Sequence, residues 1–88
     1  MRRHVVIVLR ELLKKDILMH ESEAREVVDA INGKDSITLD FSGIAGVGDG
    51  FLRELFAVWH KENPSVTFNI VSASSSVADA IEDAFKIK

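Results

Sequence analysis

The chain has 88 residues, a formal net charge of −3 and no cysteine. A chain of this length can bury one core, so we expect a single domain over residues 1–88. The mild negative charge argues against a nucleic-acid-binding domain, which normally presents a basic face, and the lack of cysteine excludes disulfides and thiolate metal sites.

The first predicted element is a strand over residues 4–9, HVVIVL, because an unbroken apolar and β-branched run is typical of a strand buried on both faces. Arg10 and Glu11 end this run too early for a signal peptide, and no run reaches the ~18 residues that span a membrane. We therefore expect a cytoplasmic protein that does not contact a membrane. For residues 10–16 the sequence does not decide between an extension of the strand and a helical turn. Residues 17–20 are predicted to form a short second strand.

A helix is predicted from Ser22, because apolar residues then recur with helical spacing, and the Asn-Gly pair at 32–33 is a common helix stop. Residues 36–41, SITLDF, alternate between apolar and polar side chains and predict a strand. The glycine-rich residues 43–50 connect this strand to a second amphipathic helix.

The second helix starts near Phe51 and ends before Pro64, since the residue that precedes a proline avoids helical geometry. Residues 66–71, VTFNIV, predict another strand, and the serines at 74–76 offer N-caps for a last helix. The apolar positions of that helix are Val77, Ala80, Ile81, Ala84 and Phe85. Strands that alternate with helices at these lengths predict an α/β fold, with a mainly parallel sheet of about four strands and three helices.

The segment GIAGVGDGF (43–51) lies between a predicted strand and a predicted helix, where nucleotide-binding proteins cradle phosphate. Gly46 and Gly48 have the spacing of a dinucleotide motif, but Phe51 replaces its third glycine and the segment has no lysine. Asp49 places a carboxylate at the start of the helix, where it would repel a phosphate. We therefore interpret Asp49 as an N-cap and the glycines as residues that permit positive φ in a tight turn. A small-ligand or nucleotide site formed by residues 43–50 is the alternative.

The other polar residues do not form a recognisable catalytic or metal-binding set. His4, His20 and His60 lie on different elements without metal-ligand spacing. The serines of SASSS (72–76) have no partner base, and Asp40, at the end of its strand, is as well suited to cap a turn. We therefore expect that the protein is not an enzyme and holds neither a metal nor a cofactor.

Four segments carry a family resemblance: LDFSGI at 39–44, VGDGFLRELF at 47–56, NP at 63–64 and VSASSSVADAI at 71–81, with a weaker match in LMHESEA at 18–24. From about residue 18 to residue 84 the chain resembles the STAS-like domain family of unknown function, small bacterial and archaeal domains related to anti-sigma-factor antagonists. The resemblance implies a STAS fold, in which helices pack on a mostly parallel sheet, and a role in bacterial signalling.

In anti-sigma-factor antagonists, a partner ATPase phosphorylates a serine at the start of the helix that follows the LDF-like strand, and the added charge breaks the complex. The resemblance places this serine position on Asp49, which a serine kinase cannot phosphorylate. Aspartate carries about one negative charge, against the roughly −1.5 to −2 of phosphoserine. The chain also departs from the family pattern at Glu21, Arg53 and Ser72, where the family tends to have arginine, an acidic residue and asparagine.

The resemblance and the lack of a catalytic set together predict a non-catalytic regulatory module that binds other proteins. Its predicted partner-binding residues are Ser42, Gly46, Gly48, Asp49, Gly50 and Arg53. The implied partner is a histidine-kinase-type ATPase or a transcription regulator. We also expect a homodimer formed through an edge strand at residues 4–9, where Arg2, Arg3 and Arg10 could protect the edge from unwanted pairing.

Overall fold

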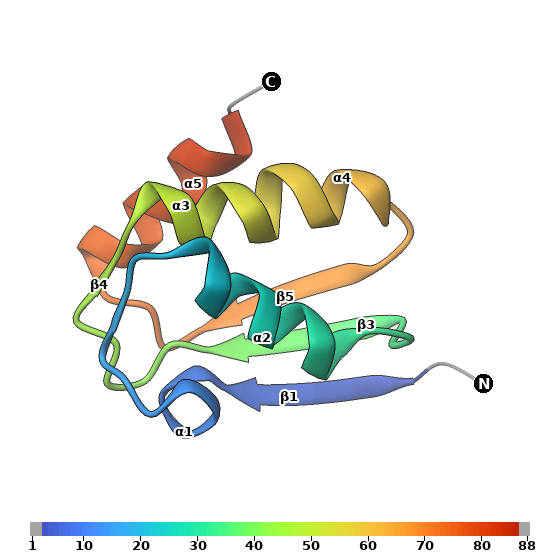
Figure 1. Cartoon of the computed structure of the whole chain (residues 1–88), viewed down its shortest axis with the longest axis horizontal. Helices are drawn as coiled ribbons and strands as arrows, with labels where there is room; N and C mark the ends of the chain where they lie inside the picture. Colours follow the sequence, from blue (N-terminus) through green and yellow to red (C-terminus); the bar gives the residue numbers. More distant parts are fainter. Residues whose placement is uncertain (1–2, 87–88) are drawn as a thin grey trace.

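The computed structural model describes residues 3–86, of which residues 85 and 86 are described by their backbone alone. In chain order the elements are β1 (His4–Val8), α1 (Leu9–Leu13), β2 (Ile17–Leu18), α2 (Glu21–Ile31), β3 (Ser36–Asp40), β4 (Gly46–Val47), α3 (Asp49–Leu52), η1 (Arg53–Trp59), α4 (His60–Glu62), β5 (Thr67–Val71) and α5 (Ser75–Lys86). The segments α3, η1, which is π-helical, and α4 follow one another without a break and form one long helix (Figure 1). This order confirms the predicted α/β fold.

The main sheet contains three parallel strands in the order β1-β3-β5. The central strand β3 pairs with both neighbours, so that Ile37 lies between Val5 and Phe68. A second parallel pair, β2 with β4, forms a separate two-stranded sheet. The structure therefore confirms a mainly parallel arrangement, but divides the strands into a group of three and a group of two.

Residues 9–18, which the sequence left partly open, form a short helix followed by a short strand. Leu9 and Leu13 of α1 lie four residues apart and are both buried, so one face of this helix joins the core. Lys14 ends α1 in the left-handed region, with a φ of 57°, and β2 begins three residues later. The described chain thus has a fourth helix beyond the three that the sequence predicts.

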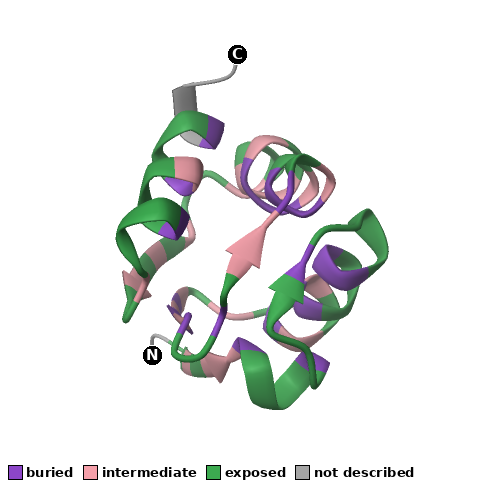
Figure 2. Ribbon diagram, turned by 90° about the vertical axis from the view of Figure 1, so that its left-hand side faces the viewer, coloured by how far each residue is buried: buried purple, intermediate pink, exposed green. Residues whose placement is uncertain are grey.

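The core lies between the three-stranded sheet and the helices α2, α3–η1–α4 and α5 (Figures 1 and 2). The alternation of β3 explains this arrangement, because Ile37 and Leu39 point to the same face and are both fully buried. Leu55 of η1 is fully buried in the same cluster. Trp59 packs edge-on against Phe68 of β5, with ring centroids 5.6 Å apart, as expected for an aromatic residue on the inner stripe of a helix.

The last helix begins as predicted, because the Ser74 hydroxyl accepts a hydrogen bond from the Val77 N–H at 3.4 Å. Val77, Ile81 and Ala84 are buried, whereas the side chain of Phe85 lies outside the described residues. In the described part of the chain, no helix has the length and apolar character that a membrane crossing requires.

The prediction that the first strand is buried on both faces is wrong. β1 is an edge strand, and Val6 on its outer face is 56% exposed. The helices that contribute to the core cover the other face of the sheet, so β1 buries only the side chains that alternate toward them. On the outer face the ring of His4 lies between two hydroxyl groups, with Nδ1 2.9 Å from Ser36 Oγ and Nε2 3.3 Å from Thr38 Oγ1.

Candidate functional site

The glycine-rich segment runs from the end of β3 to the start of α3. Gly43 turns the chain with a φ of +76°, and the Cδ atom of Arg10 lies 2.8 Å from the position that a Cβ would occupy there. The chain then pairs with β2 as β4 and enters α3 at Asp49. Within residues 43–50, positive φ occurs at Gly43 alone. The interpretation that the glycines permit positive φ is therefore correct for one of them and wrong for the other three.

Gly48 and Gly50 instead allow the start of α3 to pack closely against the chain between β2 and α2. A Cβ on Gly48 would lie 2.8 Å from Met19 Sδ and 3.0 Å from Met19 Cα, and a Cβ on Gly50 would lie 2.9 Å from the Met19 carbonyl oxygen. A Cβ on Gly46 would meet no atom within 4 Å. Gly48 is buried, whereas Gly46 and Gly50 are half-buried.

Backbone N–H groups of the segment are directed toward the same neighbouring chain. The Gly48 N–H donates to the Leu18 carbonyl at 2.7 Å, and the Phe51 N–H donates to the Met19 carbonyl at 3.3 Å. A phosphate cradle at a helix start requires N–H groups that point toward the ligand. Because these two donors bond within the protein, the geometry favours a structural turn over a phosphate site.

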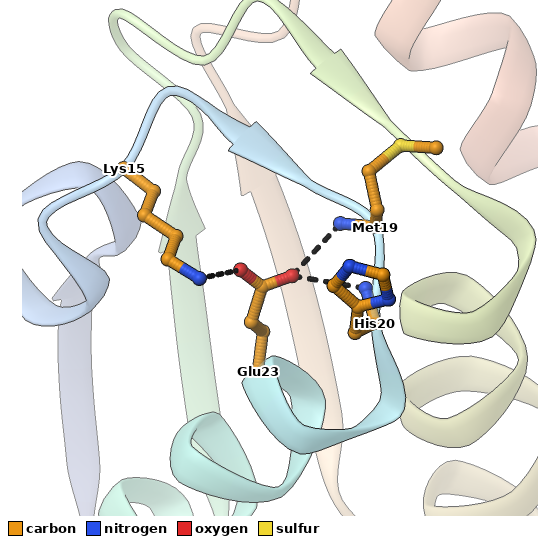
Figure 3. A network of polar contacts seen from close by, with 4 residues as sticks. All are labelled: Lys15, Met19, His20 and Glu23. Carbon is orange, nitrogen blue, oxygen red and sulfur yellow. Dashed lines mark hydrogen bonds and ion pairs between the residues drawn. The ribbon is translucent and has the colours of Figure 1, made fainter.

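Glu23 of α2 holds in place the stretch between β2 and α2, against which the glycine-rich segment packs (Figure 3). Its carboxylate, whose side chain is 4% exposed, accepts hydrogen bonds from the Met19 N–H at 2.8 Å, the His20 N–H at 2.9 Å and the Lys15 ammonium at 2.7 Å. Burial raises the pKa of Glu23, but the hydrogen bonds from Lys15, His20 and Met19 outweigh it and hold this pKa below its usual value. The hydrogen bond between Lys15 and Glu23 also raises the pKa of Lys15. Residues 15–20 are thereby held against the start of α2.

Asp49 is the first residue of α3, and Gly48 occupies the N-cap position. The prediction that Asp49 caps the helix is therefore wrong, because Asp49 already lies inside the helix and no side chain caps its N-terminus. Within the described part of the chain, the exposed Asp49 carboxylate accepts no hydrogen bond and forms no ion pair. Arg53 lies one turn further along and is also exposed.

A hollow of about 140 Å³ lies between this helix start and α5. It is lined by Val47, Asp49, Leu52, Arg53, Ala80, Asp83 and Ala84. The apolar members supply its inner wall, since Leu52 and Ala84 are each 4% exposed. The three charged members, Asp49, Arg53 and Asp83, are exposed. Cavities of about 150 Å³ admit one benzene-sized group, so the hollow can accept a single side chain of a partner.

Of the predicted partner-binding residues, Asp49 and Arg53 line this hollow, whereas Ser42 does not. Ser42 follows β3, and its N–H donates to Asp40 Oδ1 at 2.8 Å. The hydrogen bonds from the Ser42 N–H and hydroxyl lower the pKa of Asp40. Asp40 therefore caps a turn, as the sequence suggested, and Ser42 is engaged in that turn.

The residues of α5 complete the hollow, and the sequence did not indicate them as site residues. The helix has three exposed carboxylates, Asp79, Glu82 and Asp83, and the sequence alone does not show which of them lies at the hollow. Only the packing of α5 beside α3 places Asp83 at the hollow. Among the described residues, no group of three or more His, Cys, Asp or Glu side chains is placed to hold a metal ion.

Comparison with known proteins identifies the family. Residues 23–78 match the family model of the STAS-like domain of unknown function (DUF4325), which extends from the first turn of α2 into α5 and includes the glycine-rich segment. No curated protein and no solved structure gives a match. Because the family model covers more than half of the chain, this protein belongs to the family of STAS-like domains of unknown function.

Proposed function

We propose that this domain is a non-catalytic regulatory module that binds a partner protein through the hollow between α3 and α5. The observation that carries the proposal is the exposed Asp49 carboxylate at the opening of the hollow, which makes no hydrogen bond or ion pair with the described residues. A charge that no described residue pairs or hydrogen-bonds is available to a partner.

The family resemblance supports a regulatory role for this position. Asp49 stands where anti-sigma-factor antagonists carry a phosphorylated serine, so its charge is permanent and of about one unit. We infer that the domain is not switched by phosphorylation at this residue, and that its partner, unlike the ATPase of the antagonists, is bound rather than released by a negative charge here. The proposed partner is a histidine-kinase-type ATPase or a transcription regulator.

The size of the hollow supports a protein partner over a small-molecule ligand. Small-ligand sites usually have volumes of about 300–1,000 Å³. The hollow beside Asp49, at about 140 Å³, lies below this range. Two of the N–H groups at the helix start, those of Gly48 and Phe51, donate to Leu18 and Met19 and are therefore not available to a nucleotide phosphate.

Isothermal titration calorimetry tests the proposal with histidine-kinase-type ATPases and transcription regulators encoded beside this gene. The test variant is Asp49→Asn, which keeps the shape of the side chain and removes its charge. The matched control is Asp29→Asn, which removes one exposed carboxylate of α2 that lines neither this hollow nor the one beside β5. We expect the wild type and the control to bind equally and Asp49→Asn to bind about tenfold more weakly, equivalent to about 1.4 kcal/mol.

Two outcomes would contradict the proposal. The first is that no such ATPase or regulator binds the wild type. The second is that Asp49→Asn and Asp29→Asn bind equally well. A thermal shift with a nucleotide would support the alternative of a ligand site, since a ligand at 100 times its Kd stabilises a protein by about 2.7 kcal/mol.

A further inference from the structure

The second surface of interest is the free edge of β5, which lies away from the hollow beside Asp49. β5 is the outer strand of the main sheet and pairs with β3 alone. The Thr67 N–H donates to the Asp35 carbonyl at 3.0 Å, and the Phe41 N–H donates to the Val71 carbonyl at 2.9 Å.

These two bonds define which backbone groups of β5 point outward. In a parallel ladder every second residue directs its N–H and C=O toward the same neighbour. Thr67 and Val71 face β3, so the N–H and C=O groups of Phe68 and Ile70 face away from the sheet. Within the described chain no other strand pairs with them.

β5 also lacks the features that protect an edge strand from pairing. Its sequence TFNIV contains no charged residue and no proline. Natural proteins usually place lysine, proline or a bulge on such an edge. The unpaired edge of β5 can therefore accept a further strand.

A second hollow, of about 450 Å³, adjoins this edge. It is lined by Ile70, Ser72 and Ala73 at the end of β5 and by Ala78, Ile81 and Glu82 of α5. Ile70 and Ile81 belong to the core side of the sheet. Alternate side chains of a strand added to β5 would point to this side and enter the hollow.

The charge of α5 indicates the chemistry of the added strand. Over Ser75–Lys86 this helix carries Asp79, Glu82 and Asp83 against one basic residue, Lys86, so its sequence sums to a net negative charge. Pairing of two copies along β5 would bring two such acidic helices together, which like-charge repulsion disfavours. A basic segment of a different protein would be attracted instead.

We propose that the edge of β5 and the adjoining hollow bind an extended, basic peptide segment of a partner protein. The segment pairs with the outward N–H and C=O groups of Phe68 and Ile70 as a fourth strand. Apolar side chains of the segment enter the hollow, and its lysine or arginine side chains lie beside the acidic helix α5. This site is separate from the surface around Asp49 and does not depend on it.

Fluorescence anisotropy with a short synthetic peptide of alternating lysine and valine tests this site. The first control peptide has glutamate in place of lysine, and the second has proline at its central valine, which removes a donor from the added strand. We expect the lysine–valine peptide to bind at least about tenfold more tightly than either control. Equal binding of the proline peptide would overturn the proposed strand pairing, and equal binding of the glutamate peptide would overturn the proposed charge selection.

Variants of the domain locate the binding site. Ala78→Trp fills the hollow from an exposed position of α5, and Ala45→Trp adds the same bulk at an exposed position elsewhere. We expect Ala78→Trp to abolish peptide binding, Ala45→Trp to preserve it, and bound peptide to slow the amide exchange of Phe68 and Ile70. Peptide binding that Ala78→Trp leaves intact and Asp49→Asn removes would overturn this proposal while supporting the surface around Asp49. If Asp49→Asn loses binding of the partner protein but binds the peptide as the wild type does, the result supports a peptide site that is independent of the surface around Asp49.

Discussion

Alanine substitutions in the glycine-rich segment test whether its glycines serve close packing. Gly48→Ala places a Cβ 2.8 Å from Met19 Sδ and 3.0 Å from Met19 Cα, although its φ of −115° suits alanine. Overpacking of this kind costs about 1–3 kcal/mol, so we expect a loss of about 2 kcal/mol and a fall in Tm of about 8–16 °C. Gly50→Ala meets the Met19 carbonyl oxygen at 2.9 Å, and its steric cost is partly offset by about 0.5–1 kcal/mol of helix propensity.

Gly46→Ala is the matched control, because no atom lies within 4 Å of its Cβ position and its φ is not positive. We expect its stability to lie within about 0.5 kcal/mol of the wild type in urea unfolding followed by circular dichroism. Adding Met19→Ala should partly rescue Gly48→Ala, which meets the Met19 side chain, but not Gly50→Ala, which meets the backbone. Equal destabilisation by all three glycine variants, or no destabilisation by Gly48→Ala, would refute the packing explanation.

Three further predictions concern the rest of the fold. The pKa of Glu23 is below its usual value in the folded state, so its contribution to stability is complete above the unfolded pKa of about 4.3 and declines as pH falls through the folded pKa. Urea unfolding at falling pH should show this decline in the wild type and a smaller one in Glu23→Gln. Ser74→Ala removes the N-cap of α5 and should cost about 1 kcal/mol in the same assay, whereas no loss would show that the hydroxyl does not cap the helix. Static light scattering tests pairing of two copies along β1: a mass of two chains that Val6→Lys reduces to one supports it, and a wild-type mass of one chain contradicts it.

The sequence was sufficient to predict the fold class, because apolar periodicity changes clearly between strands and helices. Asn32 directly follows α2, and the long helix ends at Glu62, two residues before Pro64, as predicted. The helical stripe that contains Leu55 and Trp59 is buried or half-buried, also as predicted. The exposure of β1 could not be predicted in this way. An apolar run does not show which face the helices cover, and the position of Val6 on the outer face depends on the order of the strands in the sheet.

The candidate site was predicted only in part, for similar reasons. Asp49 and Arg53 lie one helical turn apart, so their shared location followed from sequence spacing. The contribution of Asp83 depends on how α5 packs beside α3, which no local pattern encodes. The role of Gly48 depends on a contact with Met19, 29 residues earlier in the chain, so the local pattern suggested a turn instead.

The most direct test of the proposed function measures the complex with the partner ATPase over time after ATP is added. The account predicts that the wild-type complex persists and takes up no phosphate, because Asp49 replaces the serine that a kinase would modify. Asp49→Ser restores that serine and removes the carboxylate charge, so its complex should be weaker than the wild-type complex before ATP is added and should take up phosphate afterwards. Dissociation of the wild-type complex with phosphate on Ser42 or another serine would contradict the claim that this domain binds its partner without a phosphorylation switch.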